Sequence, residues 1–239
     1  MKNALVTGGS GGIGAAICRR LAADGCHVYI HAHRGRQAAQ TLAEAICAGG
    51  GSAQVLAFDV TDSRAAADVL TPLVEHQPIQ ILVNNAGIHD DVVFPGMRAE
   101  QWHRVIDVSV NGFFNVTQPL MMPMIRSRWG RIINVSSIAA LTGSRGQVNY
   151  SAAKGALNSA TKSLAQEVAS RGITVNAVAP GIIDTPMSQS AFDAQDIARM
   201  VPMKRAGTPG EVADLIGFLA SAQAAYITGQ IISINGGII

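Results

Sequence analysis

Asn3–Val6 (NALV) leads directly into Thr7–Gly14 (TGGSGGIG), and this junction decides the fold. An apolar run that ends in closely spaced glycines and continues with an apolar residue at every fourth position is typical of a strand, a tight turn and an amphipathic helix. Gly8 and Gly12 let the backbone approach a pyrophosphate, and Gly14 lets the helix touch the strand. The free N–H groups of the helix N-terminus favour phosphate binding. We therefore predict a dinucleotide site at this turn.

The same alternation continues along the chain and predicts the rest of the fold. Strict alternation of strand and helix implies parallel strands, right-handed crossovers and helices on both faces. A helix is predicted over 212–221, because Thr208–Glu211 (TPGE) supplies a cap, a first-turn proline and a glutamate. We predict one α/β domain over 1–239, with its chemistry in the loops after the strands. The expected buried strands are 3–7, 27–32, 53–58, 81–83, 131–135, 173–178 and 230–234.

Composition excludes several functions. Of 239 residues, 48% are apolar and 14% are charged, which argues against disorder and suggests surface covered by self-association. A net charge of +2 gives no support for nucleic-acid binding, and no run is apolar enough for a membrane span. Without a hydrophobic signal region, we expect a cytoplasmic protein. Cys18, Cys26 and Cys47 fit no ligand pattern, so we expect buried reduced thiols and no metal site.

The end of the second predicted strand bears on the coenzyme. Enzymes that use NAD commonly place an acidic side chain here for the ribose hydroxyls, whereas a 2′-phosphate requires a cation. This chain has Ala32 at that point, followed by His33 and Arg34. The pattern favours NADP(H), although Arg34 would also suit the start of a solvated helix.

Two further strands end in residues that suit a nucleotide. Asp59-Val60 follows the third predicted strand, and Asp59 could accept a hydrogen bond from an adenine amino group. Asn84–Gly87 (NNAG) follows the fourth, where small Ala86 and Gly87 leave room for a ribose. Either segment alone would fit an ordinary turn.

Ser137, Tyr150 and Lys154 form the strongest constellation. Tyr150 and Lys154 lie four residues apart and therefore on one face of a helix. An ammonium ~4 Å away, in an effective dielectric of ~20, stabilises a phenolate by roughly 4 kcal/mol, or about three pKa units. This predicts a Tyr150 pKa near ~7 rather than ~10, suited to proton transfer to a carbonyl. Ser137 could bind the same oxygen. A surface tyrosine–lysine pair is the alternative interpretation.

Taken together, these motifs resemble the short-chain dehydrogenase/reductase family over essentially the whole chain. The matching segments are TGGSGGIG, NNAG, Asn111, Ser137, Tyr150–Lys154 (YSAAK) and Pro180-Gly181. The resemblance implies a Rossmann-type doubly wound sheet of seven parallel strands and a homotetramer built on two long helices, 101–127 and 150–171. It also implies a catalytic tetrad of Asn111, Ser137, Tyr150 and Lys154, in which Asn111 positions a water. The implied cofactor contacts are Gly8, Ser10, Gly11, Gly12, Ile13, Gly14, His33, Arg34, Asp59, Val60, Asn85, Ala86, Gly87, Tyr150, Lys154, Pro180, Gly181, Ile183 and Thr185.

Within that family the chain is most similar to bacterial reductases of 3-oxoacyl groups on acyl carrier protein. The similarity is carried by 130–133 (GRII), 170–176 (SRGITVN) and 225–230 (AYITGQ). It implies an NADP-dependent oxidoreductase that converts a 3-oxoacyl thioester on the carrier to the (3R)-3-hydroxyacyl form, in fatty-acid or related synthesis. It also implies that Arg128 and Arg171 dock the acidic carrier.

Two departures and two alternatives belong beside this expectation. Many NADPH-using relatives have an arginine where this chain has Gly11, and the segment 89–97 differs from the usual polar one. Since that segment borders the expected substrate entrance, an aryl-polyene or polyketide ketoreductase is a further possibility. The alternatives are a reductase of a free small carbonyl or alcohol substrate, and a non-catalytic cofactor-binding regulator. The complete set of predicted catalytic residues argues against the regulator.

Overall fold

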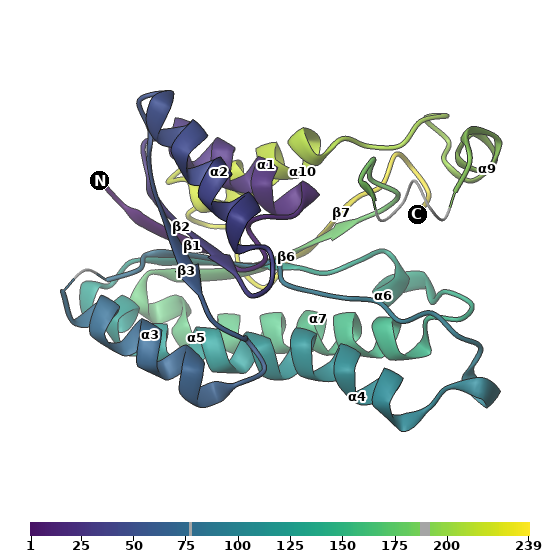
Figure 1. Cartoon of the computed structure of the whole chain (residues 1–239), viewed down its shortest axis with the longest axis horizontal. Coiled ribbons are helices and arrows are strands. Elements are labelled where there is room, and N and C mark those ends of the chain that lie inside the picture. The colour runs from purple at the N-terminus through teal and green to yellow at the C-terminus, as the bar shows by residue number, and fades with distance from the viewer. Residues whose placement is uncertain (77, 187–191) are drawn as a thin grey trace.

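The computed structural model describes residues 1–76, 78–186 and 192–239. One all-parallel sheet of seven strands runs through its centre in the order β3-β2-β1-β4-β5-β6-β7 (Figure 1). The strand order reverses between β1 and β4, which is where a doubly wound sheet opens a crevice at its carboxyl edge. The strands are β1 (Asn3–Val6), β2 (His27–Ala32), β3 (Ser52–Ala57), β4 (Ile81–Asn84), β5 (Gly130–Val135), β6 (Ile173–Pro180) and β7 (Ile231–Ile234).

Helices cover both faces of the sheet, as the alternation predicts. One layer contains α1 (Gly12–Ala23), α2 (Arg36–Ala48) and α10 (Pro209–Ala220) (Figure 1). The other contains α3 (Ser63–His76), α4 (Ala99–Ile106), α5 (Gly112–Ser127) and α7 (Val148–Val168). Shorter elements are η1 (Phe94–Gly96), η2 (Asp107–Asn111), α6 (Ala139–Thr142), η3 (Ala169–Arg171) and α9 (Ala194–Met200). Each layer buries its own apolar cluster against the sheet.

A local capping signal sets the start of α10. Thr208 Oγ1 accepts a hydrogen bond from the Glu211 amide at 3.2 Å, and Glu211 Oε2 accepts one from the Thr208 amide at 2.7 Å. This reciprocal cap starts α10 at Pro209, three residues before the predicted 212–221. The predicted long helix 101–127 is α4 and α5 joined by η2, a π-helical turn that inserts extra backbone between them.

Two predictions about burial were wrong. The edge strands β3 and β7 are only partly buried, because each has a neighbouring strand on one side alone. Cys47 is exposed, whereas Cys18 and Cys26 are buried as expected. Cys47 lies outside the buried stripe of α2, which is formed by Ala39, Leu42, Ala43 and Ile46.

Candidate active site

The structure brings Ser137, Tyr150 and Lys154 together at the carboxyl edge of the sheet. Ser137 follows β5, and the other two lie in the first two turns of α7. The side chains of Ser137 and Tyr150 are hydrogen-bonded to each other. The Lys154 ammonium lies 5.7 Å from the centre of the Tyr150 ring and donates a hydrogen bond to the Val135 carbonyl at 2.8 Å. Only 3% of Lys154 is exposed.

Burial governs the protonation of this pair. It raises the pKa of Tyr150, the hydrogen bond with Ser137 lowers it, and the negative charge of Asp91 raises it further. Burial lowers the pKa of Lys154 to about 8. The prediction that a neighbouring ammonium brings Tyr150 near neutrality was therefore wrong, because desolvation acts against the phenolate. At pH 7 the pair holds a neutral phenol and a largely protonated amine, so the phenol is in the state that donates a proton.

The loop after β4 closes over this pair. A Cβ on Gly87 would lie 3.0 Å from Lys154 Nζ, so only glycine lets the chain pass here without a shift. Further along the loop, Asp91 accepts a hydrogen bond from Gln147 Nε2 at 2.8 Å and lies 3.1 Å from His89 Nδ1. Since Asp91 acts electrostatically on Tyr150, the segment 89–97 borders the candidate catalytic residues as expected.

The glycine turn is held by hydrogen bonds from the loop after β4. Asn85 Nδ2 donates to the carbonyls of Thr7 at 2.9 Å and Gly8 at 3.1 Å. Thr7 Oγ1 accepts from the amides of Asn85 and Ala86, both at 3.0 Å. A Cβ on Gly14 would collide with the Gly8 carbonyl oxygen, which confirms that the helix packs closely on the turn. Asn85, expected to contact the cofactor, thus also fixes the shape of the turn.

His31 holds the same glycine turn through a hydrogen bond, a role that the sequence analysis did not identify. It is 2% exposed, and its Nδ1 accepts a hydrogen bond from the Gly8 amide at 3.1 Å. With Nδ1 as the acceptor, Nε2 carries the proton and donates to the Phe58 carbonyl at 3.0 Å. Burial lowers the pKa of His31 to about 4, so the ring is neutral at pH 7.

Gly11, Gly12 and Thr185, three of the predicted cofactor residues, lie at the N-terminus of α1. Gly11 caps this helix, and the nearest heavy atom to a Cβ built there is 3.8 Å away, which leaves the turn open. On the far side, a Cβ on Gly12 would lie 3.0 Å from Thr185 Cγ2. This cradle of free helix N–H groups fits a pyrophosphate. Four more of the predicted cofactor residues contact other parts of the chain. The Pro180 carbonyl accepts a hydrogen bond from the Ile138 amide, and Gly181 packs on Asn235. Ile183 forms a β-bridge with Gly207, and Ser10 lies against Gly35.

After the end of β2, the predicted cation His33 lies beside a carboxylate. His33 Nδ1 is 3.5 Å from Asp59 Oδ2, and Thr61 donates two hydrogen bonds of 2.9 Å to Asp59 Oδ1. Burial raises the pKa of Asp59, but the Thr61 bonds and the charges of His33 and Arg34 outweigh it and lower the pKa. His33 and Arg34 are both exposed at the end of β2. Val60 is buried, and its carbonyl accepts from Asn115 Nδ2 at 2.9 Å.

Asn111 is not brought into the cluster of Ser137, Tyr150 and Lys154. Its side chain is exposed at the end of η2, and its amide donates to Asp107 Oδ1 of the same turn at 2.7 Å. The extra backbone of the π-helical turn rotates the residues that follow it relative to α4, so regular helical spacing misplaces them. In this turn the buried polar side chain is that of Ser109.

Arg128 and Arg171 lie together, but at the wrong edge of the sheet. Arg128 follows α5 and precedes β5, and its guanidinium donates to the Ser170 carbonyl at 3.1 Å. Arg171 ends η3, just before β6. Both therefore lie near the amino ends of strands, whereas Ser137 follows the carboxyl end of β5. β5 spans six residues, or about 20 Å, so the expectation of two cations beside this chain's own cleft was wrong.

The sequence analysis also did not predict a hydrogen-bonded network of four buried polar side chains. Asn84 Nδ2 donates to Asn134 Oδ1 at 2.9 Å and to Thr117 Oγ1 at 3.1 Å, and Asn134 Nδ2 donates to Thr161 Oγ1 at 2.8 Å. The network joins β4 and β5 to α5 and α7. The available signal was Asn134 within the predicted buried strand 131–135, since buried amides require partners. Asn84 was predicted to follow the strand 81–83, whereas the structure includes it in β4.

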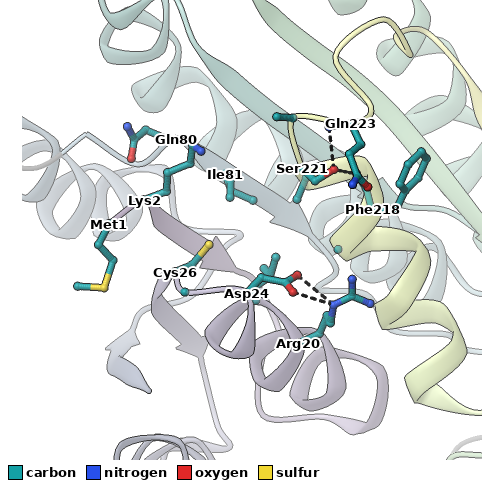
Figure 2. A pocket seen from close by; sticks show the side chains of 15 residues that line it. Met1, Lys2, Arg20, Asp24, Cys26, Gln80, Ile81, Phe218, Ser221 and Gln223 are labelled. Atoms are coloured by element: carbon teal, nitrogen blue, oxygen red, sulfur yellow. Dashed lines mark hydrogen bonds and ion pairs between the residues drawn. The ribbon is translucent and has the colours of Figure 1, made fainter. Parts of the chain in front are cut away.

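A cavity of about 950 Å³ opens at the amino edge, away from the catalytic residues. Figure 2 shows Arg20 and Asp24 paired beside it, with Lys2, Gln80 and Ser221 around the rim. In the part of the chain that the structure describes, no group of histidine, cysteine or acidic residues could hold a metal. Nor does any helix described there have the length and hydropathy to cross a membrane.

Comparison with known proteins places the chain in a family. Residues 2–196 match the model of the short chain dehydrogenase family. The chain is 46% identical, over 98% of both sequences, to the 3-oxoacyl-[acyl-carrier-protein] reductase FabG of Aggregatibacter actinomycetemcomitans. It is 43% identical to the FabG of Escherichia coli K12, over 99% of this chain and 96% of that protein. It is 42% identical to an acetoacetyl-CoA reductase of Allochromatium vinosum, over 98% and 97%. The chain belongs to the short-chain dehydrogenase family.

Proposed function

We propose that this chain is an NADPH-dependent reductase of 3-oxoacyl thioesters carried by acyl carrier protein, forming the (3R)-3-hydroxyacyl product in the cytoplasm. The observation that carries the proposal is the Tyr150–Lys154 pair, hydrogen-bonded to Ser137 and covered by the loop at Gly87. The names of the most similar relatives support the substrate class.

The chemistry follows from the protonation of the pair. The bound nicotinamide would supply the hydride that attacks the ketone carbon. The neutral Tyr150 phenol then donates its proton to the carbonyl oxygen, and the Ser137 hydroxyl hydrogen-bonds that oxygen as negative charge develops on it. The Lys154 ammonium, which is itself buried, stabilises the phenolate that remains.

NADPH is proposed over NADH because of the exposed cations at the end of β2. His33 and Arg34 follow Ala32, with no acidic side chain at that position to bind a free ribose 2′-hydroxyl. Asp59 lies next to His33, with 3.5 Å between Asp59 Oδ2 and His33 Nδ1. The ribose 2′-phosphate would therefore contact Arg34 directly, whereas it would compete with Asp59 for His33.

The test is a panel of NADPH-oxidation assays. The substrates are 3-oxoacyl chains of different length and conjugation, each offered on acyl carrier protein and as a free thioester, with NADH run in parallel. We expect a higher kcat/KM for the carrier-bound forms and for NADPH. Lack of turnover with every 3-oxoacyl compound would refute the proposed substrate class.

Reduction of a coenzyme A thioester is the second candidate, because one relative of 42% identity is named acetoacetyl-CoA reductase. The same panel separates the two functions. Equal kcat/KM for acetoacetyl-CoA and the carrier-bound acetoacetyl group would favour the coenzyme A substrate.

We further propose that Arg128 and Arg171 dock the carrier for the active site of another copy. Helices α5 and α7 both begin near the catalytic residues and both end near these arginines. Phe114 and Met122 of α5 are 62% and 53% exposed, which suits an interface between copies. A two-fold axis perpendicular to the helices would place the arginines of one copy beside Tyr150 of the next. A homotetramer built on this contact is the proposed assembly.

Mixed assemblies test this arrangement. One variant, R128E/R171E, keeps the catalytic residues, and the other, Y150F, keeps the docking residues. If docking acts across the interface, co-expressed and co-purified mixtures will recover carrier-bound turnover that neither variant has alone. A free thioester serves as the control, since R128E/R171E should reduce it normally. Failure of the mixture to recover carrier-bound turnover would refute docking across copies.

A further inference from the structure

His31 continues the hydrogen bonding of the sheet beyond the point where the ladder between β1 and β2 stops. The register of these two strands ends at Val6 and Ile30. At the next residue, the His31 carbonyl accepts a hydrogen bond from the Gly9 amide at 2.9 Å. His31 Nδ1 accepts a second one from the Gly8 amide at 3.1 Å. The first bond uses backbone alone, whereas the second depends on which side chain stands at position 31.

The other ring nitrogen of His31 selects the tautomer that can accept this bond. Nε2 lies 3.0 Å from the Phe58 carbonyl, which can only accept, so Nε2 carries the proton and Nδ1 is left as an acceptor. The imidazole also packs against the Phe58 ring, with 4.2 Å between the ring centroids. Since His31 is 2% exposed, the ring is closed off from bulk water. These contacts fix both its orientation and its tautomer.

Gly8 connects the His31 ring to the start of α1. Its φ of +62° lies in the left-handed region that favours glycine. Its carbonyl accepts hydrogen bonds from Asn85 Nδ2 at 3.1 Å and from the Gly11 amide at 3.4 Å, and Gly14 packs directly on the same oxygen. Its amide, by contrast, has His31 Nδ1 as its one acceptor among the described residues. A change at His31 would therefore turn Gly8 and move the first residues of α1.

The first turn of α1 is the part of the chain that suits a pyrophosphate. The N-cap residue is Gly11, which has no side chain that could occupy the amides of this turn. A phosphate accepts hydrogen bonds from several such amides at once, so its affinity depends on how they are aligned. The alignment is set where α1 meets the glycine turn, which is where Gly8 is held.

We propose that His31 is a positioning residue for the coenzyme: its Nδ1 fixes the orientation of Gly8 and thereby the amides of α1 that bind the pyrophosphate. The inference rests on the coenzyme site of the proposed function and is independent of the carbonyl substrate. Because His31 is buried, it acts through the glycine turn and not by touching the coenzyme. Its loss should therefore appear in the Kd and KM for the coenzyme rather than in kcat.

Two substitutions separate the two hydrogen bonds of the ring. H31N places an amide oxygen near the position of Nδ1, so it keeps the acceptor for Gly8 and loses the donor to Phe58. H31Q places an amide N–H near the position of Nε2, so it keeps the donor and loses the acceptor. H27Q is the matched control. His27 also lies in β2 and contacts β3, with 2.7 Å between its Nδ1 and Ser52 Oγ, but it stands at the amino end of the strand.

Fluorescence titration measures the Kd for NADPH and for NADH, and thermal unfolding measures the Tm of each variant. We expect H31Q to raise the Kd for both coenzymes about tenfold, because both carry the same pyrophosphate, and H31N to stay within about threefold of the original chain. Each of these variants loses one buried hydrogen bond, so both should lower Tm by a similar amount. A purely structural role of His31 would not separate their Kd values at equal Tm. H27Q should bind both coenzymes as the original chain does.

Several results would overturn the inference. One is an H31Q protein with unchanged Kd for both coenzymes, and another is equal weakening in H31N, H31Q and the control H27Q. A loss confined to NADPH would place the effect at the 2′-phosphate instead of the glycine turn. If H31Q does not fold, H31N decides alone: a Kd near that of the original chain supports the inference, and a tenfold weaker one contradicts it. The titrations contain no 3-oxoacyl compound, so a failure of the proposed reduction leaves this test intact.

Discussion

Replacing Lys154 with methionine should stabilise the protein and abolish most of its activity. Burial lowers the pKa of Lys154 from 10.5 to about 8, a difference that corresponds to about 3 kcal/mol of unfavourable charge burial. Methionine keeps the apolar stem but leaves the Val135 carbonyl without its donor, which costs about 1 kcal/mol. The net gain at pH 7 is about 2 kcal/mol, or roughly 4–8 °C in Tm for a chain of this size.

The pH dependence of the stability gain in K154M shows whether the buried charge of Lys154 causes it. Below pH 8 the amine is protonated in both the folded and unfolded states, so the burial cost is fully present. Above its unfolded pKa the amine is neutral in both, and the cost disappears. The advantage of K154M should therefore shrink as the pH rises from 8 to 10.5. Urea unfolding at equal protein concentration measures it, with K162M as the exposed control on the same helix. A K154M protein no more stable than the original at pH 7, or with a gain independent of pH, would refute this reasoning.

Three further changes test other parts of the site. Y150F should bind NADPH normally and lose at least about 100-fold in kcat; near-normal turnover would contradict the assigned proton donor. G14A should weaken NADPH binding by about 1–3 kcal/mol in a fluorescence titration, because its Cβ collides with the Gly8 carbonyl, whereas G155A, with open space around it, should not. As the pH falls from 6.5 towards 4, unfolded His31 takes up a proton and the folded ring does not. The free energy of unfolding should then decrease by up to about 3 kcal/mol, and H31L should lack this slope.

The sequence predicted what depends on local chemistry. The glycine turn and the Tyr150–Lys154 spacing are each set within a few residues, and the structure has both at the carboxyl edge. The π-helical turn could not be predicted from periodicity, because one extra backbone position changes the helical phase of every residue after it. Asn111 was selected from the family resemblance, and in the structure the buried polar side chain of this turn is that of Ser109.

The pKa prediction failed for a different reason. It considered one favourable charge at a short distance in a surface-like dielectric. In the structure Lys154 is buried and Tyr150 is half-buried, and desolvation opposes the ammonium and the phenolate alike. Burial depends on packing from distant parts of the chain, such as Gly87 against Lys154, and composition or spacing does not reveal it.

The position of the arginines, by contrast, was available from the sequence. Arg128 and Arg171 each directly precede a strand, and in a parallel sheet all residues that precede strands lie at the edge opposite the chemistry. One chain therefore carries its catalytic residues and its proposed docking residues at opposite ends of the same helix layer. A carrier that needs both must bridge two copies, so assembly would select carrier-bound substrates while leaving the chemistry of each active site unchanged. Affinity for the carrier and turnover of a free thioester should then depend on separate sets of residues.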